Sequence, residues 1–392
     1  MTTVVISPSN VANFPEGGGH FWVYMQYAQG LRRLGCDVYW LERFRRGGDP
    51  ARDDAALSTF FGRMAHYGLA GKVLLYVGDE SGDEAGGAPT FIGATAAEAA
   101  ALFLRADLLL NFHYAIDPAI LGAFTRTALV DIDPGLLQFW ISAGQLAVPR
   151  HDLYFTTGET VGTPGARFPD CGLPWVRVRP PICLDLWPVT DATPGAAFST
   201  VSSWWGGGAK GRAEWIVDGA GTGYDNCKRV SFLEFATLPR LTTQPLELAL
   251  NLSADAEDVA ERRLLEGMGW RVRHSREVAA TPETYGAYIQ RSRGEFSCAK
   301  PSCMKFQNAW VSDRTLCYLA SGRPVVVQHT GPSAFLPNGE GMFRFTTLPE
   351  AAAALAAVDA DYRRHRRSAR EIAEAYFDAR RVLSNVLDLA LH

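Results

Sequence analysis

The sequence has few features of a secreted or zinc-stabilised protein. It holds seven cysteines in 392 residues, an odd number, and it has no C-x-x-C pair. The two closest, Cys298 and Cys303, have no second pair of His or Cys nearby that would complete a zinc site. Scattered cysteines of this kind indicate reduced thiols, and we therefore expect a cytoplasmic protein.

Long apolar runs and a strong charge imbalance are also absent. No stretch approaches the roughly 20 apolar residues that cross a membrane, and the first eight residues lack the basic region and the apolar length of a signal peptide. The 38 Lys and Arg residues nearly balance the 42 Asp and Glu residues, which leaves a net charge of -4. We therefore expect neither nucleic acid nor an acidic membrane as a partner.

The chain does contain enough apolar residues for more than one core. Its hydrophobic content is 47%, and its length of 392 residues exceeds the roughly 250–300 residues that one core usually reaches. Predicted buried strands alternate with predicted helices along both halves, which favours parallel sheets. We expect an α/β fold with two Rossmann-like domains, residues 1–185 and 186–370, and a final helical segment at 371–392.

The stretch from Gly294 to Gln328 carries the strongest functional signal. A short extended segment leads into a polar loop with Lys300 and Lys305, and a helix follows that Ser312 or Asp313 can cap. A buried strand comes directly after that helix. Strand ends and helix N-termini arranged in this order bind anionic ligands.

Residues 313–328, DRTLCYLASGRPVVVQ, followed by Gly331 and by LPNGEG at 336–341, resemble the donor-nucleotide signature of GT-B glycosyltransferases. The resemblance is to divergent members of the bacterial family 1 and family 4 type, and it extends to the start of the chain through Leu41. It implies two facing Rossmann-like domains, with the acceptor bound by the first and a nucleotide-sugar by the second, and a last helix that crosses back to the first domain. Retaining members place two Glu residues close together. Here Glu295 and Asp313 are separated by a longer loop, so we favour inversion.

Six residues of the second half are candidate donor-binding residues: Lys228, Lys300, Ser312, Asp313, Arg314 and Thr315. A Lys or Arg near a helix start can neutralise a diphosphate leaving group. Asp313 can accept hydrogen bonds from ribose hydroxyls, and Thr315 with nearby backbone N–H groups can contact phosphate oxygens. Solvated basic residues and simple helix capping are the alternative interpretation, and Lys305 competes with Lys300 for the same role.

The loop after the first predicted strand ends in a run of three glycines and His20. Gly18 and Gly19 let the backbone approach a ligand where side chains would collide, and the resemblance implies that this loop closes on the sugar. His20 starts a helix, whose N-terminus lowers the pKa of an imidazole and keeps it able to accept a proton. His20 is therefore a candidate catalytic base, or alternatively a loop histidine that bonds the backbone.

Asp131 and Asp133 follow another predicted strand, at the sheet edge where ligands bind. Either carboxylate could accept the acceptor's proton or bind the acceptor sugar, and Asp133 could instead cap a turn. His113, after the preceding strand, is a further acceptor-side candidate. The two aspartates also form a D-x-D pattern, but they fall in the acceptor half, so we expect no metal.

The expected function is metal-independent transfer of a hexosyl group from a nucleotide-sugar to a hydroxyl-bearing small molecule or glycan, without a cofactor, with His20 or Asp133 as the base. A nucleotide-sugar 2-epimerase on the same fold and a non-catalytic nucleotide- or sugar-binding protein are the alternatives. A homodimer is an open alternative to a monomer.

Trp204, Trp205 and Trp310 either stack on sugar or base rings or fill the core. The loops 78–89 and 158–174 are expected to set acceptor specificity, the second of them irregular.

Overall fold

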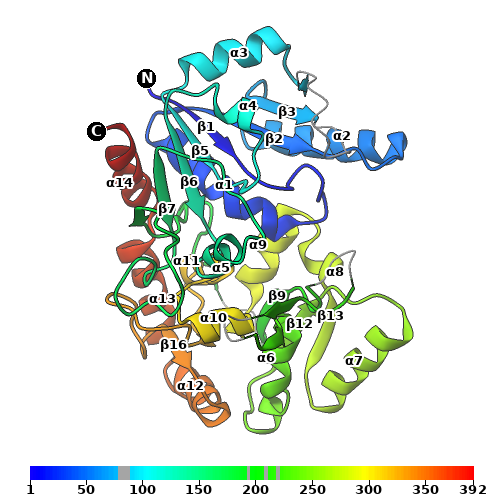
Figure 1. Cartoon of the computed structure of the whole chain (residues 1–392). Coiled ribbons are helices and arrows are strands. Elements are labelled where there is room, and N and C mark those ends of the chain that lie inside the picture. The colour runs from blue at the N-terminus through cyan, green and yellow to red at the C-terminus, as the bar shows by residue number, and fades with distance from the viewer. Residues whose placement is uncertain (78–88, 192–194, 207–210, 218–220) are drawn as a thin grey trace. The chain divides into compact units, whose positions relative to one another are not determined.

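The chain forms two compact units, each with its own sheet. The computed structural model (Figure 1) describes residues 1–77, 89–191, 195–206, 211–217 and 221–392. Unit 1 comprises Met1–Gly158, Pro169–Cys183 and Ala379–His392, and unit 2 comprises Glu159–Phe168 and Leu184–Asp378. Within the described ranges, no helix is both long and apolar enough to cross a bilayer.

Of the two loops expected to set specificity, the structure describes the second in full and only the last residue of the first. Gly78–Pro89 lies outside the described residues apart from Pro89. Gly158–Pro174 is described throughout, and it forms turns and bends without a helix or strand, as predicted. All seven cysteines are described as well, and each is a free thiol.

Unit 1 is built on an eight-stranded sheet in the order β4-β3-β2-β1-β5-β6-β7-β8. The strands are β1 (Thr3–Ser7), β2 (Asp37–Phe44), β3 (Val73–Val77), β4 (Thr90–Ile92), β5 (Leu108–Asn111), β6 (Thr127–Asp131), β7 (Leu153–Thr156) and β8 (Trp175–Arg177). Neighbouring strands run parallel, except that β4 is antiparallel to β3. Apolar runs in the sequence predict β1, β2, β3, β5 and β6, whereas β4, β7 and β8 are not predicted.

Helices cover both faces of this sheet (Figure 1). They are α1 (Gly18–Arg33), α2 (Pro50–His66), α3 (Ala96–Arg105), α4 (Pro118–Leu121), α5 (Leu136–Ser142) and α14 (Ala379–Leu391). On one face, Trp40 of β2 contacts Tyr24 of α1 and Phe60 of α2. On the other, Phe103 of α3 lies in a cluster that includes Val5 of β1. Two covered faces explain why these strands are apolar throughout.

The last helix, α14, packs on α1 of unit 1, and one glycine of α1 lies at this contact. A Cβ atom at Gly30 would come within 2.4 Å of Leu383 and 3.0 Å of Ala379. The hydrogen side chain therefore lets the two helices approach more closely than any larger residue would allow. The sequence of α14 is apolar at helical spacing and supplies the buried partners Val382, Leu383 and Val386.

Unit 2 contains a six-stranded parallel sheet in the order β13-β12-β9-β14-β15-β16. Its strands are β9 (Phe198–Ser202), β12 (Leu246–Leu250), β13 (Arg271–His274), β14 (Gly294–Ser297), β15 (Val325–Gln328) and β16 (Met342–Phe345). A separate antiparallel hairpin is formed by β10 (Trp215–Val217) and β11 (Gly223–Asp225). The predicted α/β class with two parallel sheets is confirmed.

The helices of unit 2 are α6 (Lys228–Glu234), α7 (Ala256–Gly267), α8 (Ser275–Ala279), α9 (Pro282–Arg291), α10 (Pro301–Phe306), α11 (Asp313–Ala320), α12 (Leu348–Ala360) and α13 (Tyr362–Tyr376), with a 3-10 turn at Leu238–Arg240. The core against α6, α7 and α12 includes Phe296 and Phe345, whose rings stack with centroids 5.3 Å apart. α9 and α13 pack on α11. Both faces of the sheet are therefore covered, as a doubly wound fold requires.

Several short elements of unit 2 differ from the sequence prediction, among them a helix, a hairpin and an edge strand. The loop predicted between Ser297 and Trp310 contains the short helix α10, which begins with Pro301 at its first position, where proline's fixed φ suits a helix. The hairpin β10–β11 and the edge strand β16 were not expected. Each is only three or four residues long, too short for a periodic pattern to show in the sequence.

Candidate functional site

Each sheet reverses its direction of winding at one point, and open α/β sheets bind ligands beside the carboxyl ends of the strands there. In unit 2, β9 lies between β12, which follows it in the chain, and β14, to which the chain returns later. The loops that leave β9 and β14 therefore diverge. In unit 1 the same reversal falls between β1 and β5. These two sheet edges are the candidate sites.

The basic candidates of unit 2 meet at its reversal point. Lys228 is the first residue of α6. Its pKa is lowered to about 7, first by burial and then by the positive charges of Arg314 and Lys300, while Asp313 acts in the opposite direction. Four of the six predicted donor residues are thus electrostatic neighbours. An amino group whose pKa lies this close to physiological pH is partly uncharged, and it gains a proton when an anion binds beside it.

Arg314 is held rigidly by a buried ion pair. Its Nε donates to Oε1 of Glu295 at 2.8 Å, and its Nη1 donates to the carbonyl of Val201 at 2.9 Å. Burial alone would lower the pKa of Arg314, but Glu295 outweighs burial and raises it. The guanidinium therefore stays charged and contributes a fixed positive charge to this edge of the sheet. These two bonds occupy two of its nitrogens.

Lys300 lies at the start of α10, on the loop that leaves β14. Its Nζ forms an ion pair with Glu214, with 2.9 Å between Nζ and Oε2. Glu214 precedes β10 directly, so the pair ties the hairpin to the loop after β14. The amide N–H of Ser302 in α10 donates to Oδ1 of Asn226 at 2.8 Å. Two separate connections therefore join α10 to the segment before α6.

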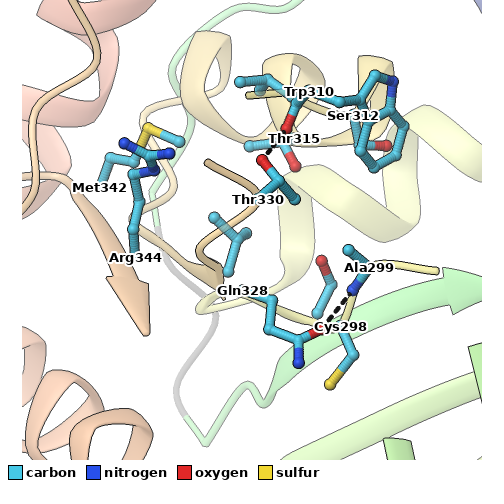
Figure 2. Close-up of a pocket in the computed structure, with 12 residues that line it drawn as sticks. Cys298, Ala299, Trp310, Ser312, Thr315, Gln328, Thr330, Met342 and Arg344 are labelled. Atoms are coloured by element: carbon cyan, nitrogen blue, oxygen red, sulfur yellow. Dashed lines mark hydrogen bonds between the residues drawn. The ribbon is translucent and has the colours of Figure 1, made fainter. Parts of the chain in front are cut away.

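Ser312 and Thr315 line a small pocket at the carboxyl ends of β14 and β15 (Figure 2). Ser312 is the N-cap of α11, and its Oγ accepts from the amide of Arg314 at 3.3 Å. Gln328 also lines the pocket, and its Oε1 accepts from the amide of Ala299 at 2.9 Å. Its other lining residues are Ser297, Cys298, Trp310, Val311, Val327, Thr330, Met342 and Arg344. Among the polar lining residues, Ser297 and Gln328 end β14 and β15, and Ser312 and Thr315 lie at the start of α11.

The segment before α11 has an unusual backbone. Gln307 and Ala309 have positive φ values of 52° and 57°, a region that residues other than glycine rarely adopt. The amide of Ala309 donates to the carbonyl of Thr330 at 3.0 Å, and a Cβ at Gly331 would come within 2.4 Å of the carbonyl oxygen of Gln307. Such strain persists only where neighbours enforce it, and it is common at binding sites.

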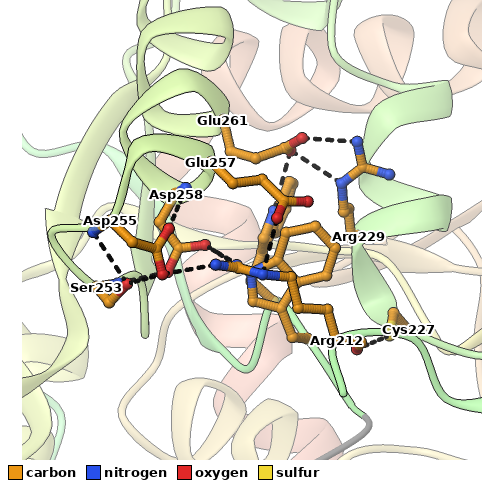
Figure 3. Close-up of polar contacts among 10 residues, drawn as sticks. Arg212, Cys227, Arg229, Ser253, Asp255, Glu257, Asp258 and Glu261 are labelled. Carbon is orange, nitrogen blue, oxygen red and sulfur yellow. Dashed lines mark hydrogen bonds and ion pairs between the residues drawn. The ribbon is translucent and has the colours of Figure 1, made fainter.

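The tryptophans after β9 have structural partners. Trp204 is fully buried in the core. Trp205 lies close to the guanidinium groups of Arg212 and Arg229, which are 5.0 and 5.1 Å from its ring centroid. Figure 3 shows the ion pairs around it: Arg212 with Asp255, Glu257 and Asp258, and Arg229 with Glu261. Trp204 therefore fills the core, Trp205 packs against the two arginines, and Trp310 lines the pocket.

In unit 1, Gly18 and Gly19 are the first residues of α1, and His20 follows them. The Nε2 of His20 lies 2.8 Å from the carbonyl oxygen of Ser9. A carbonyl only accepts, so a neutral imidazole in this geometry has its proton on Nε2 and its lone pair on Nδ1. Nδ1 is therefore the nitrogen that can accept a proton without breaking the bond to Ser9.

Asp131 is a buried carboxyl group with several donors around it. Its Oδ2 accepts from Nε2 of Gln138 at 2.9 Å and from the hydroxyl of Thr156 at 2.8 Å. Its Oδ1 accepts from the amide of Asp133 at 3.0 Å. Burial raises its pKa to about 7, although the bonds from Gln138 and Thr156 oppose that shift. Asp131 thus fixes the strand ends of β6 and β7 from inside the unit.

Asp133, by contrast, is exposed on the surface of unit 1. Its Oδ2 lies 3.5 Å from the hydroxyl of Tyr114, and its carbonyl accepts from Leu136 and Leu137 at the start of α5. It therefore makes the predicted turn with its backbone and leaves its carboxylate at the sheet edge. Within the described ranges, no three His, Cys, Asp or Glu side chains come together as metal ligands.

His113 follows β5 and is 8% exposed. Its pKa is lowered to about 4, first by burial and then by Arg43 and Arg45. The ring is therefore neutral at physiological pH. The sequence analysis did not single out the two arginines. The run Arg43–Arg46, which follows a predicted strand, nevertheless indicates positive charge at that position.

Comparisons with known proteins identify the fold. No family model matches the chain, and a search of curated proteins found no match. Among solved structures, it is similar to sucrose-phosphate synthase from Thermosynechococcus elongatus, with a TM-score of 0.52, 14% identity and 99% and 98% of the two chains covered. Anabaena HepE in complex with UDP and glucose matches with a TM-score of 0.57, 11% identity and 99% of each chain. An alpha-glucosyltransferase in complex with UDP and a 13-mer DNA containing an HMU base matches with a TM-score of 0.60, 10% identity, and 100% and 99% coverage.

The chain therefore has the GT-B fold over its full length, as the resemblance of residues 313–341 implied. Among the residues of the candidate site in unit 2 that the sequence did not indicate are Glu214, Asn226 and Arg344. Glu214 and Arg344 are placed by the short elements that the pattern missed. Asn226 gave no signal, because its bond to Ser302 joins positions 76 residues apart.

Proposed function

We propose that this protein is a glycosyltransferase that moves a hexosyl group from a nucleotide-sugar to a hydroxyl-bearing acceptor. The observation that carries the proposal is the convergence of Lys228, Lys300 and Arg314 beside the N-terminus of α11, at the reversal point of a sheet in a GT-B fold. A nucleoside diphosphate is the ligand with the matching charge. UDP is the first nucleotide to test, since HepE was solved with UDP.

In this proposal the basic cluster stabilises the departing diphosphate. As the bond between the anomeric carbon and the diphosphate oxygen breaks, negative charge grows on that oxygen, and a cation already in place costs little reorganisation. Arg314 is charged throughout because of Glu295. Lys228 becomes charged when the diphosphate binds. Three basic side chains can supply this charge without a metal, and we propose a metal-independent reaction.

Unit 1 would bind the acceptor at the reversal point between β1 and β5. His20, through Nδ1, or the exposed carboxylate of Asp133 would accept the proton of the acceptor hydroxyl. The acceptor oxygen forms the new glycosidic bond, the nucleoside diphosphate leaves with the electron pair of the old bond, and the anomeric centre inverts. Asp131 is a positioning residue in this scheme, because its oxygens bind Gln138, Thr156 and the amide of Asp133.

Thermal melting with UDP, GDP, dTDP and ADP, each with and without EDTA, tests the donor site. A nucleotide at about 100 times its dissociation constant adds about 2.7 kcal/mol of stability, enough for a readable rise in Tm. We expect a rise with one nucleotide, unaffected by EDTA and lost in Asp313→Ala. No rise with any nucleotide would contradict the proposal, and a rise abolished by EDTA would contradict metal independence.

Turnover assays separate transfer from the two alternatives. A glycosyltransferase releases nucleoside diphosphate much faster when an acceptor is supplied. A 2-epimerase converts the nucleotide-sugar without any acceptor. A non-catalytic binding protein shows the melting shift but no release with any acceptor. The matched comparison is His20→Gln with Asp133→Asn: the variant that lacks the base should lose acceptor-dependent release while keeping the melting shift.

A further inference from the structure

The hairpin β10–β11 belongs to unit 2 and lies in the chain between β9 and α6, the elements that lead to the proposed donor site. Glu214, directly before β10, pairs with Lys300 at 2.9 Å. Asn226, directly after β11, accepts from the amide of Ser302 in α10 at 2.8 Å, and its own amide donates to the carbonyl of Glu214 at 2.7 Å. Both ends of the hairpin are therefore fixed to the start of α10 and to each other.

The two faces of this hairpin differ in what covers them. Successive side chains of a strand point to opposite faces, and Ile216 pairs with Tyr224 across the hairpin. Ile216 is buried, and the ammonium group of Lys305 in α10 lies 4.5 Å from the ring centroid of Tyr224. These residues form an inner face that packs on unit 2. Trp215 and Val217 belong to the outer face, and they are 70% and 54% exposed.

The indole of Trp215 lies against a glycine of the facing strand. A Cβ atom at Gly223 would be 3.8 Å from Cε3 of the indole, which is an ordinary van der Waals distance. The backbone of the hairpin therefore supports the ring at this position, while most of the residue stays accessible. A supported ring loses little conformational freedom when a ligand stacks on it, so binding costs less entropy. Tryptophan is mostly buried in folded proteins, so one this exposed is unusual.

The area and the charge of the outer face limit what can bind there. Two exposed side chains cannot supply the roughly 800 Å² that each partner contributes to a stable protein interface. Between Arg212 and Lys228 the sequence has no Lys, Arg or His, and it has three acidic residues, Glu214, Asp218 and Asp225. The basic neighbours of the hairpin, Lys300 and Lys305, contact its base and its inner face. The outer face is therefore suited to a small neutral ring, and neither anionic lipid nor nucleic acid has a charge that matches it.

We propose that the outer face of the hairpin β10–β11 binds a neutral glycan by stacking one of its pyranose rings on Trp215. The inference rests on the proposed function and names the class of acceptor, an oligosaccharide. The C–H groups on one face of a pyranose carry partial positive charge and meet the negative face of the indole. Val217 extends the apolar surface beside the ring. Because the inner face packs against Lys305 of α10, the outer face points away from that helix. The stacked ring is therefore a sugar beyond the one that reacts, and a glycan of several sugars is needed to reach both places.

Calorimetric titrations of the full chain with maltohexaose, laminarihexaose, mannohexaose and glucose test this directly. We expect at least one of the hexasaccharides to bind at least about tenfold more tightly than glucose, because further rings bury more area. Trp215→Ala should weaken that binding at least about fivefold, and Trp215→Phe, which keeps an aromatic ring, should weaken it less. Leu264→Ala is the matched control, because Leu264 is an exposed apolar residue of α7 in the same unit. It should leave the affinity for the hexasaccharide unchanged.

The inference is overturned if no hexasaccharide binds at about 10 mM, well above a millimolar Kd, or if Trp215→Ala and Leu264→Ala behave alike. A Kd for UDP that rises in Trp215→Ala would assign the ring to the nucleotide and overturn it too.

Two sedimentation measurements test the other occupants of the outer face. Binding to vesicles of phosphatidylglycerol and phosphatidylcholine, or self-association of the protein alone, overturns the assignment to a glycan if Trp215→Ala abolishes it. If UDP does not bind to the wild type, the donor site fails, yet the titrations with hexasaccharides still decide the role of Trp215.

Discussion

Arg314 and Glu295 form an ion pair of 2.8 Å whose side chains are only 8% and 0% exposed. The pair joins the first turn of α11 to β14 in the centre of the sheet of unit 2. It places a permanent positive charge beside Lys228. The proposed donor site therefore depends on an ion pair between two residues that are 19 positions apart.

Removing one member of this pair should be costly. Arg314→Met leaves the Glu295 carboxylate buried without its counter-ion, and we expect a loss of about 3–5 kcal/mol in the free energy of unfolding. Urea unfolding followed by fluorescence measures it. The control is Arg273→Met, which breaks an exposed pair with Glu277 (45% and 56% exposed) and should cost at most about 1 kcal/mol. Equal effects of the two changes would contradict a structural role for the Arg314 pair.

Binding of UDP should weaken as the pH rises above about 7. The pKa of Lys228 is lowered to about 7 in the free protein, and a bound diphosphate raises it. Above pH 7 the free side chain is neutral, so binding must take up a proton, and affinity falls by up to about tenfold per pH unit. Calorimetry in buffers of different ionisation enthalpy measures this uptake. In Lys228→Met the slope should vanish. A pH-independent Kd in the wild type would disprove the proton linkage.

Glu42 should make the protein less stable as the pH rises from about 4.5 to 7. Burial raises its pKa to about 7, although the bonds from Trp40, Ala12 and Val11 oppose that shift. The folded state then binds more protons than the unfolded state across this window, so stability is fully present below pH 4.5 and is lost as the pH rises through 7. Asp131 acts in the same direction.

Unfolding measured at pH 5 and pH 8 checks this expectation. Glu42→Gln should reduce the loss of stability between the two values, and Glu42→Gln with Asp131→Asn should nearly abolish it. The exposed Glu266→Gln serves as the control and should leave the loss unchanged. If the double variant loses as much stability as the wild type, the assignment to these two carboxyl groups is wrong.

Two glycine-to-alanine changes should have opposite effects. Gly30 and Gly62 both lie inside helices, where alanine is normally better by about 1 kcal/mol. A Cβ at Gly62 meets nothing within 4 Å, so Gly62→Ala should raise Tm. At Gly30 it would collide with Leu383 at 2.4 Å, and the overpacking should cost about 1–3 kcal/mol. Melting curves of both variants suffice. A higher Tm for Gly30→Ala would contradict the close packing of α1 on α14.

The sequence predicted the apolar strands of the two sheets and the first residues of the helices that carry the candidate site. Val4–Ile6 and the strand before Gln328 are runs of apolar residues, and Gly322 with Pro324 ends α11, so their positions follow from local patterns. Lys228 and Ser312 could be placed at helix starts for the same reason. These features depend on neighbours in the chain alone.

The partners of the site residues could not be read from the sequence. Lys300 pairs with Glu214 across 86 positions, and the hairpin that carries Glu214 has strands too short for a periodic signal. Glu295 was noted only as a possible member of a pair of acidic residues, whereas its carboxylate fixes Arg314. Which side chains meet depends on the order of strands in the sheet, and that order is not a local property.

The most direct test of the donor site is a calorimetric titration of wild type, Lys228→Met and Lys72→Met with UDP at pH 7. Lys72 is a matched control, because it is a lysine of unit 1 paired with Asp37. We predict binding to the wild type, at least about tenfold weaker binding to Lys228→Met from the loss of one charge-assisted contact, and an unchanged Kd for Lys72→Met. Equal affinities in all three proteins, or no binding of UDP or the other nucleoside diphosphates to the wild type, would contradict the account.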